Sequence, residues 1–189
     1  MSARATRYVK YGQLSLAFFS LVCLALHPGF VLKWDEGGFS NYGIHIKTVI
    51  PYTLGFGLAS YLSLLGAHGL RRAGWRRGIF AWLLRCYGLL MLLTLVSTYV
   101  YTRSVPLKDF HTVVGIATML FEPVASLWMY FQLTGTSWSR GLLGIELLGF
   151  ALGAIDYFDV LHVLFLAQLI IAVPFGFMLV RTSTVTGVA

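Results

Sequence analysis

Long apolar stretches alternate with short charged loops from one end of the chain to the other, and this pattern limits the fold more than any motif does. Of the 189 residues, 58% are hydrophobic and only 11% are charged. A soluble domain of this size could not bury so much apolar surface, because too little polar surface would remain to face water. The sequence therefore predicts a protein whose solvent is lipid.

Six apolar stretches have about the 20 residues that a helix needs to cross a hydrocarbon core roughly 30 Å thick. They are residues 11–32, 48–70, 78–102, 110–133, 141–156 and 160–180. Their apolar runs are continuous and do not alternate with period two, which favours helices over a barrel. We expect an all-α transmembrane helix bundle with six spans in a single integral membrane domain, 1–189. The fifth stretch is the shortest, and without it the bundle would have five spans.

Basic residues mark one side of this predicted bundle. The N-terminal segment, the loop 71–77 and the residues after the sixth stretch carry Arg or Lys and no acidic residue, whereas the opposite loops mix both signs. The positive-inside rule then places both termini in the cytoplasm, in a plasma membrane or a bacterial inner membrane. The formal charge of +7 is thus a topology signal. The expected partners are membrane lipids and, as a second class, other membrane protein subunits; no soluble basic face indicates a nucleic acid.

Three charged residues fall inside the predicted spans away from the span ends, where ionisable groups are costly and face the bundle interior. Arg85 and Glu146 lie at matched depth from the cytoplasmic side, which predicts a salt bridge between them. Glu122 lies near the middle of the fourth stretch, and Pro123 after it is expected to kink the helix. We interpret these residues first as a structural polar core. A proton or ion relay through Glu122 is the second interpretation, because the sequence reveals few further polar steps.

A second polar cluster is predicted on the outer side. Asp159 and His162 are three residues apart and would share a helix face with His111 nearby. These types serve as metal ligands and as acid–base pairs, so His111, Asp159 and His162 are candidate catalytic or metal-binding residues. The spacing matches no established metal motif, which favours solvated residues and helix caps instead. The outer loops also contain Asp35, His45, Asp109 and Asp156.

No cofactor is predicted from these residues. A metal ion at the outer cluster stays open as an alternative. A haem could lie between His27, His111 and His162, which are all expected at the outer end, but nothing in the sequence selects it.

An outer Phe39-Ser40-x-x-Gly43 element follows the first apolar helix and precedes a Gly-rich second helix that ends in basic residues. His111 then opens the fourth stretch after another outer loop. This layout resembles the DRAM/Sfk-like six-pass membrane proteins and a related bacterial six-pass family of unknown function. The resemblance implies a six-helix integral membrane protein linked to lipid handling or membrane organisation, and it implies no catalytic residues. Glu122-Pro123 and the Asp156, Asp159 and His162 group depart from the pattern.

Three classes of function follow. The first is a membrane protein that acts by binding lipid-like molecules or as a small subunit of a larger complex. The second is an intramembrane enzyme on a lipid or isoprenoid substrate, which requires His111, His162 and Asp159 to converge. The third is a small transporter using Glu122, which requires a polar path through the midplane.

Overall fold

The computed structural model describes residues 2–29, 38–70, 74–132, 136–157 and 163–188, and these residues are helical with no strand among them. Seven helices lie in these ranges, and they are α1 (Ser2–Leu26), α3 (Asn41–Ile44), α4 (Val49–Leu70), α5 (Gly74–Thr98), α6 (Val105–Gln132), α7 (Ser137–Tyr157) and α8 (Leu164–Val188). All except α3 are long and apolar enough to cross a membrane. The prediction of six long apolar helices is therefore confirmed.

Several helices are longer than the apolar stretches that predicted them. Helix α7 has 21 residues, so the fifth element is long enough to span even though its most apolar part is short. Helix α1 begins at Ser2, and α8 continues to Val188, well beyond the predicted stretch. There the Thr6 hydroxyl donates to the Ser183 carbonyl at 2.8 Å, which ties the two helix ends together. Hydropathy thus marks the apolar part of each helix and misses its polar ends.

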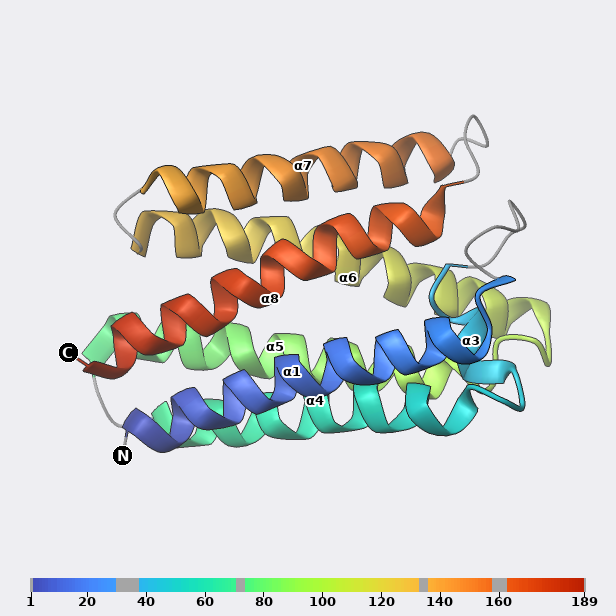
Figure 1. The fold of residues 1–189 in the computed structure, drawn as a ribbon, viewed down its shortest axis with the longest axis horizontal. Helices are drawn as coiled ribbons and strands as arrows, with labels where there is room; N and C mark the ends of the chain where they lie inside the picture. Colours follow the sequence, from blue (N-terminus) through green and yellow to red (C-terminus); the bar gives the residue numbers. More distant parts are fainter. Residues whose placement is uncertain (1, 30–37, 71–73, 133–135, 158–162, 189) are drawn as a thin grey trace.

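The six long helices lie side by side along the long axis of the molecule (Figure 1). Helix α4 packs between α1 and α5, α6 packs against α5, α7 and α8, and α8 closes the ring onto α1. Helix α7 packs against α6 and α8 and lies at one edge of the bundle (Figure 1). Both termini lie at one end, which we name the terminal end, and α3 lies at the other, which we name the α3 end (Figure 1).

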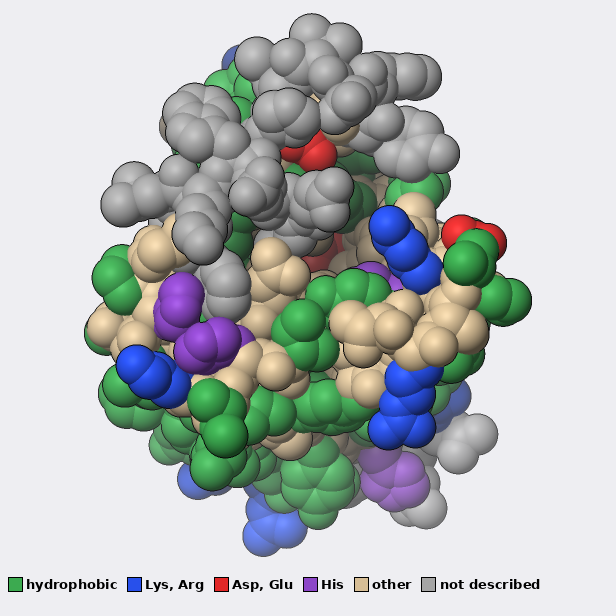
Figure 2. All heavy atoms as spheres, turned by 90° about the vertical axis from the view of Figure 1, so that its right-hand side faces the viewer, with side chains coloured by type: hydrophobic (Ala, Val, Ile, Leu, Met, Phe, Trp, Pro, Cys, Tyr) green, Lys and Arg blue, Asp and Glu red, His purple; other side chains and the backbone are tan. Residues whose placement is uncertain are grey.

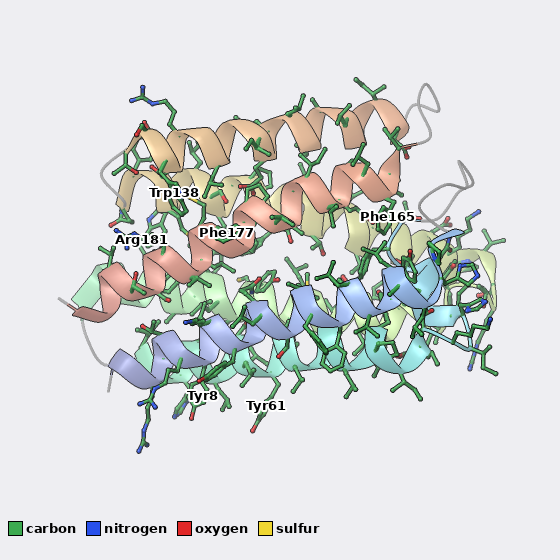
Figure 3. All side chains as sticks on the ribbon, in the orientation of Figure 1. Tyr8, Tyr61, Trp138, Phe165, Phe177 and Arg181 are labelled. Carbon is green, nitrogen blue, oxygen red and sulfur yellow. The ribbon has the colours of Figure 1, made fainter. Side chains whose placement is uncertain are left out.

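The outer surface of the bundle is apolar on every long helix. Large exposed side chains include Phe18 on α1, Trp82 on α5 and Val124 on α6. Tyr61 of α4 points away from the bundle (Figure 3). Such a belt would be unfavourable in water, so it supports the interpretation of a bundle that is surrounded by lipid.

Small residues let the helices approach closely, as membrane helices require. A Cβ added at Gly88 of α5 would lie 3.0 Å from the Ser60 carbonyl oxygen of α4, and the Ser60 hydroxyl donates to the Gly88 carbonyl at 2.7 Å. A Cβ at Gly149 of α7 would meet Ile170 and Ile171 of α8 at 2.8–3.0 Å. Gly149 therefore brings α7 against α8, and this contact turns the neighbouring face of α7 toward the interior.

Candidate functional site

A row of polar residues runs along the inward face of α6. His111, Thr118, Glu122 and Ser126 are separated by steps of seven, four and four residues, so they share one face of the helix. Glu122 is 5% exposed and Ser126 is fully buried. We name these four residues the α6 stripe. It begins near the α3 end of the bundle and passes the middle of the helix.

His111 is held by two hydroxyl groups at the α3 end. Its Nδ1 lies 2.7 Å from Ser97 Oγ of α5, and its Nε2 lies 2.9 Å from Ser40 Oγ. Ser97 donates its own proton to the Thr94 carbonyl at 3.1 Å, so its oxygen accepts from His111 Nδ1–H. In the neutral ring, Nε2 then accepts the Ser40 hydroxyl proton. The ring of Tyr101 stacks on His111 with centroids 4.7 Å apart.

The next step of the stripe is a pair of threonines. Thr94 Oγ1 of α5 lies 3.4 Å from Thr118 Oγ1 of α6, which itself donates to the Val114 carbonyl at 2.9 Å. Thr94 is therefore the donor in the pair. Thr118 lies one helical turn before Glu122. Hydroxyl groups thus extend from His111 to the turn before the buried carboxyl.

Two carboxyl groups lie in the interior, on α6 and on α7. Glu122 is 5% exposed and Glu146 is fully buried, and the two helices that carry them pack against each other. Neither oxygen of Glu146 has a hydrogen-bond partner among the described residues. The Ser126 hydroxyl lies near this carboxyl, yet it does not reach hydrogen-bond geometry and has no other partner. We name Glu122 and Glu146 the acid pair.

The predicted salt bridge between Arg85 and Glu146 is wrong. The Glu146 oxygens accept no hydrogen bond, and Arg85 is only half-buried on α5. The reason is lateral position: α5 packs mainly against α4 and α6, whereas α7 packs against α6 and α8. Equal depth along the helix axes did not place the two side chains on neighbouring helices. Among the described residues, no Lys or Arg forms an ion pair with either member of the acid pair.

Helices α1, α5 and α8 complete the surroundings of the acid pair. Tyr87 of α5 is 1% exposed, lies within electrostatic reach of Glu122, and packs on Phe175 of α8 with centroids 5.1 Å apart. Gln13 of α1 lies near Tyr87, and its Nε2 has no partner in the described part of the chain. A Cβ at Gly176 of α8 would lie 3.0 Å from Gln13 Oε1, so the amide packs closely on the backbone of α8.

Sequence reasoning found the acidic members of this site and missed the neutral ones. Gln13, Tyr87, Thr118 and Ser126 are single polar residues within apolar stretches, where they usually satisfy the backbone of their own helix. The steps of four from Thr118 to Ser126 were the one available signal. A polar residue in every turn of one helix face indicates that the face is turned away from lipid.

The predicted outer cluster is only partly within the described residues. Asp159, His162 and Asp35 lie outside them, so the convergence of His111, His162 and Asp159 stays a prediction. Asp109 is exposed on α6. Asp156 accepts a hydrogen bond from the Val163 backbone N–H at 2.5 Å, as a helix cap does at the start of α8. In the ranges that the structure describes, no group of three or more His, Cys, Asp or Glu could hold a metal ion.

Residues 38–48, which we name the plug, cover part of the α3 end. His45 lies beside His27, with ring centroids 4.3 Å apart. Partial burial lowers the pKa of His45, and the charges of His27 and Lys47 lower it further. Figure 2 looks onto this end of the molecule, where histidine and basic side chains lie around the rim of the face. The plug contains the Phe39-Ser40-x-x-Gly43 element, and its Ser40 contacts His111.

Comparison of the chain with protein-family models, with curated proteins and with solved structures found no match in any of the three. The resemblance to DRAM/Sfk-like six-pass proteins therefore stays an expectation from the sequence. What the chain can do has to be argued from its own residues.

Proposed function

We propose that this protein is a small membrane transporter that moves protons through the interior of its six-helix bundle. Glu122 and Glu146 are the groups that bind and release the proton. The α6 stripe, together with Ser97 and Thr94 of α5, is the route between the acid pair and the α3 end. The observation that carries this proposal is the acid pair itself, which is buried in an apolar bundle and has no cationic partner among the described residues.

The energetic argument starts from the cost of burying charge. An ionised carboxylate in a low-dielectric interior costs several kcal/mol unless it is paired, and two neighbouring carboxylates repel each other. No fixed cation compensates Glu146, since Arg85 does not reach it, and a buried carboxyl in this position is neutral when it binds a proton. A bound proton supplies the missing countercharge. It also turns each carboxyl into a hydrogen-bond donor that can pass the proton on.

Polar groups on both sides of the acid pair support a route. Toward the α3 end, Thr118, Thr94, Ser97 and His111 provide exchangeable hydroxyl and imidazole groups. Toward the terminal end, Ser139 lies seven residues before Glu146 on α7, so both fall on one face, and both are fully buried. Such intramembrane ionisable residues mark ion and proton pathways in membrane proteins generally.

The other two classes of function have less support. No contact among the described side chains favours a bound lipid or a subunit interface. An enzyme would need the outer cluster to converge, and two of its three residues lie outside the described ranges. Both remain predictions from the sequence.

Proton flux into vesicles tests the proposal. Purified protein is reconstituted into liposomes that contain a pH-sensitive dye, and a potassium gradient with valinomycin imposes a membrane potential. We expect the wild type to acidify the lumen, and E122Q or E146Q to reduce the flux to that of empty vesicles. D109N is the matched control, because it removes an exposed carboxyl from the same helix. Wild-type flux equal to that of empty vesicles, or full flux in E122Q and E146Q, would overturn the proposal.

A further inference from the structure

The plug is seated tightly on four helices at the α3 end. The ring of Phe39 stacks on Phe165 of α8 with centroids 5.6 Å apart, and it packs near Tyr52 and Phe56 of α4 at 5.9 Å and 5.8 Å. Phe165 lies at the start of α8, at this end of the bundle (Figure 3). Ser40 contacts His111 of α6. The plug therefore spans the outer ends of the helices that enclose the start of the polar route.

Two glycines show how closely the plug approaches these helices. A Cβ at Gly38 would clash with the side-chain amide of Gln168 on α8. A Cβ at Gly43 would clash with Thr98 Cγ2 of α5 and lie 2.7 Å from the ring of Tyr52. A side chain at Gly43 would hold the plug away from α4 and α5, whereas one at Gly38 would displace the end of the Gln168 side chain.

Polar contacts tie the plug to the bundle, and others fix its own shape. Tyr42 is fully buried, and its hydroxyl donates to the His27 carbonyl at 3.2 Å. The Phe39 backbone N–H donates to Gln168 Oε1 at 2.7 Å, Ser40 donates to His111 at 2.9 Å, and the Tyr101 hydroxyl donates to Asn41 Oδ1 at 3.4 Å. Within the plug, the Thr48 hydroxyl donates to the Tyr42 carbonyl at 2.7 Å. An element with a fixed shape moves as one unit when its external contacts break.

We infer that the plug is the outer gate of the proton route, closed when Ser40 and the Phe39 backbone bind His111 and Gln168. This inference rests on the proposed function, because it names the regulation of the same route. In the closed state, Ser40 occupies His111 Nε2, which is the one ring nitrogen that could otherwise exchange a proton with water. Displacement of the plug exposes His111 and Ser97, and through them Thr118.

The labelling rate of a cysteine introduced at position 118 reports whether the gate is open, without relying on transport. The two native cysteines, Cys23 and Cys86, are first replaced by alanine, and T118C is introduced. Labelling by a membrane-impermeant thiol reagent is followed in lipid nanodiscs, in which both ends of the bundle face the reagent. We expect slow labelling in this background. S40A and Q168L each remove one hydrogen bond of the closed state, and each should speed labelling about tenfold, the factor that corresponds to about 1.4 kcal/mol.

Matched controls distinguish opening of the gate from a general destabilisation of the α3 end. S104A removes an exposed serine at the same end of the bundle and should leave the labelling rate unchanged. Proton flux into vesicles is measured for S40A, Q168L and S104A in the chain that retains Thr118, where S40A and Q168L should raise a flux that E122Q abolishes. Q168L breaks a different contact from S40A. If one variant fails to fold, the labelling rate and the flux of the other variant still test the gate.

The two readouts distinguish the two claims. Faster labelling in S40A and Q168L without any Glu122-dependent flux would support a gated cavity and reject proton transport. Glu122-dependent flux with labelling and flux unchanged in both variants would keep the transport proposal and overturn the gate. Equal acceleration by S104A would also overturn the gate, because the effect would not then depend on the plug contacts.

Discussion

The role of a polar residue in the bundle interior depends on the side chains around it, and Glu146 is the clearest case. Its depth along the chain suggested Arg85 as a partner, but the two helices that carry them pack against different neighbours. Glu146 lies fully buried on α7, which packs against α6, the helix of Glu122 and Ser126. A charged residue in a membrane helix therefore predicts an inward-facing position, whereas its partner depends on which helices are adjacent. Adjacency is a property of the assembled bundle that a single sequence does not contain.

A double-mutant cycle tests the corrected view of Glu146. Breaking a buried ion pair costs about 3–5 kcal/mol, because the remaining charge is stranded. Since Glu146 has no such pair, we expect E146Q to leave the thermal stability in detergent unchanged or raised. R85M and E146Q should be additive to within about 0.5 kcal/mol, as expected for residues that do not interact. A coupling energy of about 3 kcal/mol between R85M and E146Q would show that Arg85 and Glu146 do form a salt bridge.

Substitution of His111 tests the hydroxyl contacts at the start of the stripe. H111F keeps an aromatic ring against Tyr101 and removes the hydrogen bonds to Ser40 and Ser97. Ser97 keeps its bond to the Thr94 carbonyl, so the loss falls mainly on the Ser40 hydroxyl, and we expect a cost of about 1 kcal/mol in chemical or thermal unfolding. V113F, on the exposed side of the same helix turn, is the control. Equal stability of H111F and wild type would mean that the two serines find other partners.

At the scale of elements, the six long helices were predictable because each apolar stretch is continuous and bounded by charged loops. The plug was not predictable as a unit. Its glycines and polar residues indicated a turn, but the contacts that seat it come from α4, α5, α6 and α8. Those contacts join residues that are far apart in sequence. Local patterns describe helices well in lipid, since backbone hydrogen bonds must close within each helix, and they say little about loops that pack on the bundle.

Gly43 should be the most sensitive glycine of the plug. G43A places a methyl group against Thr98 Cγ2 and the Tyr52 ring, and overpacking of this kind costs about 1–3 kcal/mol. G78A is the control, because no atom lies within 4 Å of a Cβ at that position in α5. T98S keeps the hydroxyl and removes the clashing methyl, so it should partly rescue G43A. Thermal unfolding in detergent measures all three, and a G43A loss no greater than that of G78A would reject this seating.

The pH dependence of the plug follows from His45. Because the folded-state pKa of His45 is below its ordinary value of 6.5, the unfolded chain binds the proton more readily as the pH falls below 6.5. Stability contributed by neutral His45 is complete above that pH and is lost as the pH falls toward the lowered pKa. We expect the unfolding temperature to fall in this window, and H45Q to remove part of that fall. An identical pH profile in H45Q would assign the effect to other groups.

At the scale of the whole molecule, an even number of long helices brings both termini to one end (Figure 1). Which end faces the cytoplasm remains a prediction from the distribution of basic residues. The plug and His111 would then face the outside, and the proton route would lead inward from there. The side of the membrane therefore decides which compartment the plug and its His45 face.

Topology is measured with two reporters. A fluorescent protein fused after Ala189 should fold and fluoresce, because the C-terminus is expected in the cytoplasm. A cysteine in place of Ile46, which is 85% exposed in the plug, should react with an impermeant reagent added to intact cells. Native cysteines are removed first, and unlabelled I46C in intact cells with labelling only after lysis would reverse the orientation.

The account depends on whether the acid pair holds an exchangeable proton in place of a fixed cation, and infrared spectroscopy observes this directly. A protonated carboxyl has a C=O stretch that shifts to lower frequency when the sample is moved into D₂O. We predict that the wild type in lipid shows such a band at neutral pH, that it shifts in D₂O, and that E122Q and E146Q each reduce it while D109N does not. A spectrum with no protonated carboxyl, or with a band that both glutamine variants retain, would contradict the account.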